Sequence, residues 1–295
     1  METINYGWIR DLPDSRDHKY TVTSTTSQTL SKLKGILPSS LDLRTYIDRV
    51  PIYNQGSLGS CTANATCYAY LHSEMRQKNT SVFAPSRLFL YYNTRVIEGT
   101  VNSDSGAYIR DAMKSSYNTG ICSEGLWKYT IGQFTTKPPV ACYDQAGICK
   151  TVEYLSVSQQ IDHIKTAIYE GNPIVFGFDV YQSFNRIGND GKMPIPKPST
   201  ESRLGGHAVC IVGFDDAIQF SEGMTGGVIV RNSWGSLWGD DGYFYMPYTV
   251  VTNNSLASDF WVIRAVTNPN LGVNPIPEPK PDPDPIKDCC QCLII

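Results

Sequence analysis

A cysteine near a glycine-rich turn is the first residue of this chain that could do chemistry. Cys61 follows the turn 55–60 and opens an apolar, alanine-rich segment, which predicts a buried helix with the thiol in its first turn. Free N–H groups and the positive end of the helix dipole favour a thiolate there, so we expect the pKa of Cys61 to be lowered. A lone cysteine on an apolar helix is more often a small core residue, so Cys61 alone does not decide the matter.

Two residues far downstream supply partners for such a thiol. His207 begins a continuous apolar run, 207–214, that predicts a buried strand. A second apolar run ends at Asn232 and Trp234, and a glycine-rich stretch follows it. A thiol, an imidazole that can act as its base and a group that orients the imidazole are the parts of a nucleophilic cysteine site. We therefore interpret Cys61, His207 and Asn232 as one site.

These motifs resemble those of the papain-like (cathepsin-type) cysteine peptidases. Gln55 stands six residues before Cys61 in a Gly-Ser-Cys context, and the strand of His207 reads Gly-His-Ala-Val. The segment that starts at Asn232 reads Asn-Ser-Trp-Gly and continues to Trp-Gly and Gly-Tyr. The interval between Cys61 and His207 is 207 − 61 = 146 residues, inside the ~130–150 that is typical of the family. The resemblance extends over residues 37–266.

The resemblance implies a role for each catalytic residue. Cys61 is the nucleophile, and His207 takes its proton and later protonates the leaving amine. Asn232 orients the imidazole, and Trp234 shields their hydrogen bond from water. Gln55 and the N–H of Cys61 donate to the oxyanion. For each residue a structural role is reasonable alone, but it is a poor explanation of the whole set.

Candidate substrate-binding residues flank these positions. The family has a Gly-Gly pair in the wall that binds an extended peptide, and Gly106 stands in that place, although it could merely turn the chain. Gly206 and Ala208 flank His207 and predict a roomy pocket, which the family fills with an apolar side chain. Trp234 is also assigned to substrate binding.

The expected fold is α+β, with a papain-like helical lobe built on the central Cys-bearing helix and an antiparallel, barrel-like β lobe. Periodicity predicts helices and strands, with Ser158 as the cap of the fourth helix. The helices are 60–78, 86–97, 107–116 and 157–170, and the strands are 174–180, 207–214, 228–231, 242–247 and 260–266. Residues 188–202 are expected to form a loop. The chain divides into 1–36, a short pro-segment-like extension; 37–150, the helical lobe with the nucleophile; 151–268, the β lobe with His and Asn; and 269–295, a linker and tail.

Composition excludes some classes of function. The 295 residues carry a net charge of −3, and 41% of them are hydrophobic, as in an ordinary globular protein. Without a basic cluster there is no electrostatic case for nucleic acid. No apolar run reaches 18 residues, and no motif indicates a cofactor or a resident metal. We expect a polypeptide substrate.

The segment 1–36 lacks the charged start and apolar core of a signal peptide, so we expect an intracellular or cytoplasmic protein. It is also too short to match the helical propeptide of the family. One hypothesis is that Trp8, Ile9 and Leu12 dock on the folded enzyme near its cleft. The alternative is a poorly ordered terminus.

The cysteines depart from the family pattern. Leu58 and Thr62 stand where the family usually has a disulfide-forming Cys and a Trp, so its disulfide framework is not reproduced. Reduced thiols are expected at Cys67, Cys122 and Cys210. Cys142 and Cys149 could pair with each other or bind metal, but two ligands without a nearby His are a weak metal signal.

The tail combines a spacer with clustered cysteines. Residues 274–285 alternate proline with other residues and predict a polyproline-type spacer. Cys292 fits a C-terminal prenylation box, although the final Ile is not among its usual last residues. Cys289 and Cys290 fit palmitate sites that would supply a second membrane anchor. The alternative is a disordered cysteine-bearing tail.

Together these features predict a papain-like cysteine endopeptidase, a thiol-dependent hydrolase. Two alternatives stay open: a catalytically silent binding module of the same fold, and an acyl transferase that uses the same Cys-His-Asn set. A silent module usually lacks a catalytic residue, and this chain has all four.

Overall fold

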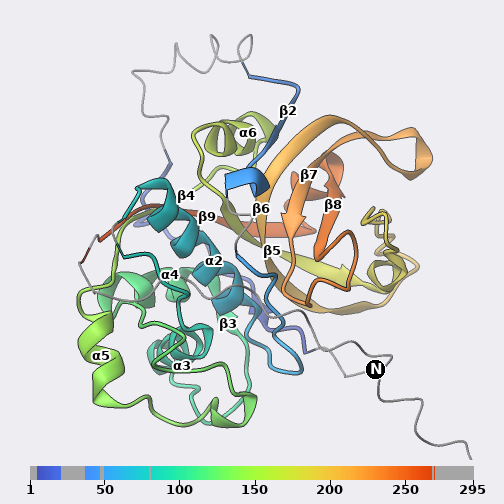
Figure 1. Ribbon diagram of the computed structural model, residues 1–295. Coiled ribbons are helices and arrows are strands. Elements are labelled where there is room, and N and C mark those ends of the chain that lie inside the picture. The colour runs from blue at the N-terminus through green and yellow to red at the C-terminus, as the bar shows by residue number, and fades with distance from the viewer. Residues whose placement is uncertain (1–4, 21–36, 47–49, 80, 268, 270–295) are drawn as a thin grey trace, which may run out of the picture.

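The computed structural model describes residues 5–20, 37–46, 50–79, 81–267 and 269 (Figure 1). Most of its helices gather on one side of the molecule and its large sheet lies on the other, with α2 between the two groups (Figure 1). The helices on the first side are α2 (Cys61–Arg76), α3 (Arg87–Glu98), α4 (Ile109–Asn118) and α5 (Val140–Ala146). This is the α+β arrangement that the sequence predicted.

The local sequence explains where these helices begin and end. α2 is buried almost all round because its small alanine residues let neighbouring elements approach it from every direction. α3 begins after Ser86, whose hydroxyl accepts the backbone N–H of Phe89 at 3.1 Å. It ends at Gly99, which has a φ of 71° and so takes the left-handed conformation that closes many helices.

The sheet is antiparallel throughout and has seven strands, in the order β4-β9-β5-β6-β7-β8, with β2 paired to β6 beside this path. Its strands are β2 (Ser40–Asp42), β4 (Thr151–Ser156), β5 (Ile174–Tyr181), β6 (Arg203–Gln219), β7 (Thr225–Arg231), β8 (Tyr243–Pro247) and β9 (Ala257–Val266). The start of the range 37–150, expected in the helical lobe, thus adds a strand to the sheet. Two short helices, α6 (Ile161–Tyr169) and α7 (Tyr248–Val251), pack against the sheet. In the part of the chain that the structure describes, 3-10 turns occur at Arg44–Tyr46, Ile131–Gln133, Gln182–Arg186 and Ser221–Gly223.

A second, small sheet joins the N-terminal segment to the helical side. β1 (Trp8–Ile9) pairs in parallel with β3 (Ala107–Tyr108), so that Trp8 lies opposite Ala107. Two segments that are far apart in the sequence therefore pair with each other, and α4 begins directly after the second of them.

The predicted helix 157–170 was wrong at its start, and Ser158 is not its cap. α6 begins at Ile161 after Gln160, and no side chain caps it. The backbone N–H of Val157 instead donates to the oxygen of Phe260, so this residue still follows the sheet. β4 and α5 were missed, because a bulged strand and a seven-residue helix leave little periodicity to read.

Among the described residues, no helix is long and apolar enough to cross a bilayer. The tail cysteines Cys289, Cys290 and Cys292 lie outside the described residues, and so does the proline-rich spacer.

Candidate active site

Cys61 is the first residue of α2, and its side chain is fully buried. The preceding turn is held by Asp104, whose carboxylate accepts the backbone N–H of Gly59 at 3.0 and 3.1 Å. Gly56 in the same turn has a φ of 58°, a left-handed conformation that glycine adopts without strain. The turn therefore delivers the thiol to the helix N-terminus.

His207 lies in β6, and a single contact fixes its tautomer. Its Nε2 is 2.8 Å from Asn232 Oδ1, and the same oxygen accepts the backbone N–H of Ser233. Because this oxygen can only accept, Nε2 carries the ring proton and Nδ1 keeps its lone pair. Trp234 stacks on the imidazole, with ring centroids 4.8 Å apart and planes at 26°. Nδ1 is buried and has no hydrogen-bond partner among the described residues.

Gln55 connects the two sides of the molecule. Its Oε1 accepts the hydroxyl of Ser233 at 2.7 Å, and its backbone N–H donates to the oxygen of the same residue at 2.9 Å. Its Nε2 donates to the oxygen of Leu58 at 3.0 Å and to that of Asn5 at 3.3 Å. The amide therefore lies between the turn before Cys61 and the loop of Asn232, with its donor end toward the N-terminal segment.

The Cys61 sulfur lies against the strand that carries His207. It receives backbone hydrogen bonds from Ala208, the next residue along β6, and from Gly7. Cys61 and Ala208 also belong to the same buried apolar cluster. The structure thus places the thiol beside the neighbour of the imidazole, where the helices meet the sheet.

Burial reverses the expected pKa of the nucleophile. We expected the helix N-terminus to lower it, and backbone hydrogen bonds to the sulfur do act in that direction. Full burial outweighs them and raises the pKa of Cys61 to about 11, because the charged thiolate would lose its hydration. Burial likewise lowers the pKa of His207 to about 4, against the opposing effect of its bond to Asn232. In this conformation burial therefore favours the neutral form of both groups.

The N-terminal segment is what covers them. Through β1 it lies alongside β3, and the N–H of Ala107 donates to the oxygen of Gly7 at 2.7 Å. Tyr6 stands edge-on to His207 and to Trp234, with ring centroids 6.3 and 6.2 Å apart. The aromatic ring and the extended backbone together close the groove above the site.

Gly7 lies between the backbone of Gly59 and the backbone of Gly106. A Cβ on Gly7 would lie 1.8 Å from the oxygen of Gly59, and a Cβ on Gly106 would lie 2.2 Å from the oxygen of Gly7. Gly106 also has a φ of 74°. Gly106 therefore lines the wall along which this extended segment runs. The backbone N–H of Gly7 acts on the Cys61 thiol and lowers its pKa, so the segment lies directly over the sulfur.

A sequence profile described as papain family cysteine protease matches residues 37–261. The chain belongs to this family. It is 42% identical over 282 residues to an uncharacterized peptidase C1-like protein of Acanthamoeba polyphaga mimivirus, which covers 90% of this chain and 88% of that protein. It is 28% identical over 236 residues to pro-cathepsin H of Mus musculus, covering 75% of this chain and 63% of the relative.

Solved structures agree. The chain superposes on xylellain, a cysteine protease from Xylella fastidiosa, with a TM-score of 0.77, 39% identity and coverage of 90% of this chain and 97% of that one. With procathepsin B of Trypanosoma congolense the TM-score is 0.67, and coverage is 90% and 87%; the identity of 17% shows the fold alone. The papain-family chain thus has the papain-like α+β fold and is a cysteine protease, a hydrolase that acts on polypeptides.

Of the three apolar residues expected to dock, one is the main anchor of the segment. Trp8 is 3% exposed, whereas Leu12 is 82% exposed and does not dock; Ile9 is half-buried. The indole Nε1 of Trp8 donates to Asp259 Oδ2 at 3.0 Å. Trp8 is therefore the apolar anchor of the segment, whereas the side chain of Leu12 faces solvent.

Arg110, near the start of α4, fastens the segment further along. Its guanidinium contacts Asp11 at 3.1 Å and Asp17 at 2.8 Å, and it donates to the oxygen of Leu12 at 2.9 Å. The carboxylates are 6% and 11% exposed, so these pairs are largely shielded from water. One side chain of the enzyme body therefore clamps two acidic residues of the segment.

The remaining described cysteines are buried free thiols. Cys149 lies in the main apolar cluster, whereas Cys142 packs in a separate small cluster with Cys122, so Cys142 and Cys149 are not neighbours in the core. Cys122 and Cys142 are in side-chain contact. Within the described part of the chain, no group of three or more His, Cys, Asp or Glu could hold a metal ion.

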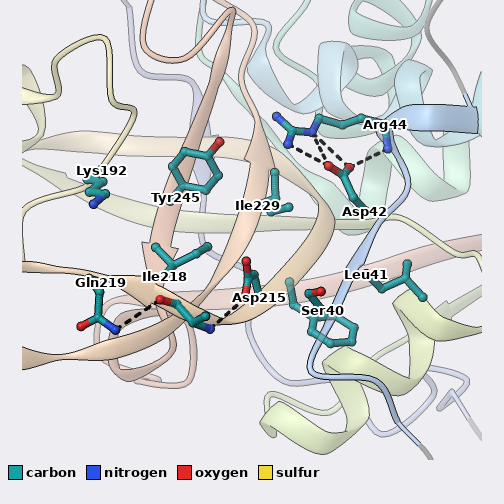
Figure 2. Close-up of a pocket in the computed structure, with 12 residues that line it drawn as sticks. Ser40, Leu41, Asp42, Arg44, Lys192, Asp215, Ile218, Gln219, Ile229 and Tyr245 are labelled. Atoms are coloured by element: carbon teal, nitrogen blue, oxygen red, sulfur yellow. Dashed lines mark hydrogen bonds and ion pairs between the residues drawn. The ribbon is translucent and has the colours of Figure 1, made fainter.

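A surface cavity of about 680 Å³ lies elsewhere, over the edge of the sheet formed by β2, β6 and β8 (Figure 2). Figure 2 shows Asp42 turned toward Arg44, and these two side chains of the cavity pair with each other. None of the predicted catalytic residues lines it. The cavity is therefore not the active site.

Sequence reasoning missed three residues at the covered cleft: Tyr6, Arg110 and Asp259. Tyr6 stands two residues before Trp8 in the sequence, so the pair of aromatic residues could have been noted as a local signal of docking. Arg110 and Asp259 carry no local signal, because each acts only through contact with a segment about 100 or 250 residues away in the chain.

Proposed function

We propose that this protease hydrolyses peptide bonds through the thiol of Cys61, with His207 as its base. The observation that carries the proposal is the fixed imidazole: Asn232 occupies Nε2 and leaves Nδ1 free, on the strand that also holds the Cys61 sulfur through Ala208. A neutral imidazole with one free nitrogen beside a thiol is the arrangement that activates a cysteine.

The reaction starts when the N-terminal segment leaves and water and substrate enter. The Cys61 proton moves to Nδ1 of His207, and the thiolate attacks the substrate carbonyl carbon. Gln55 Nε2 and the N–H of Cys61 receive the oxyanion, and each such donor is worth about 3 to 4 kcal/mol. The imidazolium then protonates the leaving amine. Water, deprotonated by the imidazole, releases the acid and restores the thiol.

The covered conformation is the latent form of the enzyme. Residues 5–11 fill the groove, and the Gln55 amide is already occupied by the oxygen of Asn5. Because the backbone N–H of Gly7 lies close enough to the Cys61 thiol to lower its pKa, the docked segment occupies the place that a substrate needs. The segment therefore acts as an internal inhibitor.

A fluorogenic peptide assay tests the proposal. The full-length protein should show low activity, and a Gly7→Ala variant, whose segment cannot dock as it does here, should show higher activity. An epoxide-type thiol inhibitor and Cys61→Ala should abolish both. Product analysis with an added amine distinguishes the hydrolase from an acyl transferase: free acid as the main product supports the proposal, and amide as the main product contradicts it.

A further inference from the structure

The slot that Trp8 fills is a side-chain pocket whose walls are two glycines. A Cβ on Gly177 of β5 would lie 1.9 Å from the indole ring, and one on Gly206 of β6 would lie 2.6 Å from it. Any side chain at either position would close the slot. The two adjacent strands therefore carry no side chain at the point where a broad, flat group enters the slot.

The slot adjoins the reactive centre. Gly206 immediately precedes His207, and Gly177 pairs across the sheet with Ala208, whose backbone hydrogen-bonds the Cys61 sulfur. A side chain in this slot therefore belongs to a residue very near the bond that is cut. This holds for any peptide in the groove, because it depends only on where the pocket lies.

A carboxylate stands at the end of the slot. Asp259 Oδ2 accepts the indole N–H of Trp8 at 3.0 Å and the backbone N–H of Asp11 at 2.8 Å. Both donors come from the N-terminal segment. When the segment leaves, the carboxylate loses both donors, and its oxygens are free to accept others. A substrate that brings N–H donors or a positive charge compensates for that loss.

The space beside Asp259 grows when the segment leaves, because residues of the segment form part of its wall. A cavity of about 440 Å³ lies next to Asp259 and is also lined by Asp11, Arg110 and Trp261. The neighbouring carboxylate of Asp179 is already paired with Arg203 at 2.8 Å. Asp259 is therefore the acidic group of this region that a substrate side chain would meet.

We propose that Asp259 is a specificity residue of the protease and that it favours arginine or tryptophan over phenylalanine and leucine in the pocket that Trp8 now fills. The proposal rests on the peptidase function proposed above. Arginine fits because its apolar stem can lie between the glycine walls while its planar guanidinium meets the carboxylate. The resemblance to the family suggested an apolar side chain, and the acidic end of the slot changes that expectation.

The test uses the full-length Gly7→Ala protein, with labelling of Cys61 by a thiol-reactive epoxide to show that its site is open. Matched fluorogenic peptides carry Arg, Trp, Phe or Leu at either of the two positions before the cleaved bond. We expect kcat/KM for the best Arg and Trp peptides to exceed that for Phe and Leu by about tenfold or more, because a polar site rejects side chains that leave it unpaired.

Asp259→Asn in the same background isolates the charge. Asp259 has a φ of 60°, and asparagine tolerates this left-handed conformation, so the variant keeps the backbone. The Arg peptide should lose about tenfold in kcat/KM, while the Phe peptide stays within about twofold. Asp179→Asn, which alters a nearby carboxylate paired with Arg203, should leave the preference unchanged.

Equal cleavage of all four peptides by the Gly7→Ala protein would overturn the assignment. So would an Asp259→Asn variant that loses activity equally on every peptide, because that pattern indicates a structural role. If Cys61 is labelled but no peptide is cut, the proposed peptidase function itself fails, and the two failures are thus distinguishable.

Discussion

A single methyl group on the N-terminal segment should switch the latent enzyme on. In Gly7→Ala the new Cβ would lie 1.8 Å from the oxygen of Gly59, 2.4 Å from its carbonyl carbon and 2.7 Å from its Cα. All three atoms are backbone of the turn that precedes α2, so they cannot swing aside as a flexible side chain would. Overpacking of this kind costs about 1–3 kcal/mol or more, and at about 1.4 kcal/mol per tenfold the upper figure shifts docking at least 100-fold. Gly7 lies outside the protease body, so the catalytic residues are untouched.

The rate at which a thiol-reactive epoxide labels Cys61 measures this shift, because the fully buried sulfur reacts only when the segment is away. Gly7→Ala should be labelled faster than the unaltered protein by about 100-fold, up to the limit set by a fully open site, and peptidase activity should rise in parallel. Leu12→Ala is the matched control, since this side chain lies on the same segment and is 82% exposed. It should behave as the unaltered protein does.

Equal labelling rates for Gly7→Ala and the unaltered protein, with both folded by circular dichroism, would refute the steric argument. Fast labelling of the unaltered protein would contradict latency itself, because it would mean that the segment spends little time in the groove.

The remaining predictions concern the clamp, its charge and the imidazole. Arg110→Ala should raise the labelling rate about 30-fold, because the net loss of its bonds to two carboxylates is about 2 kcal/mol. The labelling rate of Arg110→Lys should lie between those of Arg110→Ala and the unaltered protein. Equal rates in these three proteins would exclude a clamp. Burial and the nearby Asp259 raise the pKa of docked Asp11 to about 7, from 3.8 when free, so Asp11 favours docking fully below about pH 4 and loses this effect as the pH rises through 7. Asp11→Asn imitates the protonated form. We therefore expect the ratio of two labelling rates, that of the unaltered protein divided by that of Asp11→Asn, to rise from pH 4 to 7. A ratio that does not change with pH would contradict this. Asn232→Ala in the Gly7→Ala protein should lower kcat by about tenfold or more with little change in KM; an unchanged kcat would mean that the amide does not orient the ring.

The residues that we propose to be catalytic were visible in the sequence because each sits in a local motif. Cys61 follows a glycine-rich turn, and His207 starts an apolar strand, so residue type and neighbours indicate both position and chemistry. The direction of the thiol pKa could not be read in the same way. It depends on burial by a segment more than 50 residues away, and burial outweighs the local helix effect.

The side chains that hold the N-terminal segment in place were hidden for a related reason. Arg110 and Asp259 act by contacting residues 8–17, and neither lies in a repeated or unusual pattern. Asp259 shows only in the fold, where its left-handed backbone turns the carboxylate toward Trp8. The helix cap was mispredicted for a similar reason. Ser158 has the right residue type for a cap, but the backbone of the preceding Val157 is still hydrogen-bonded to Phe260 of the sheet.

The most direct experiment is rapid-quench mass spectrometry of the Gly7→Ala protein mixed with an activated peptide ester. We expect one acyl group per chain on Cys61, a burst of released alcohol equal to the enzyme concentration, and neither in the Gly7→Ala, Cys61→Ala protein. Turnover without an acyl group on Cys61, or with the group on another residue, would contradict the mechanism.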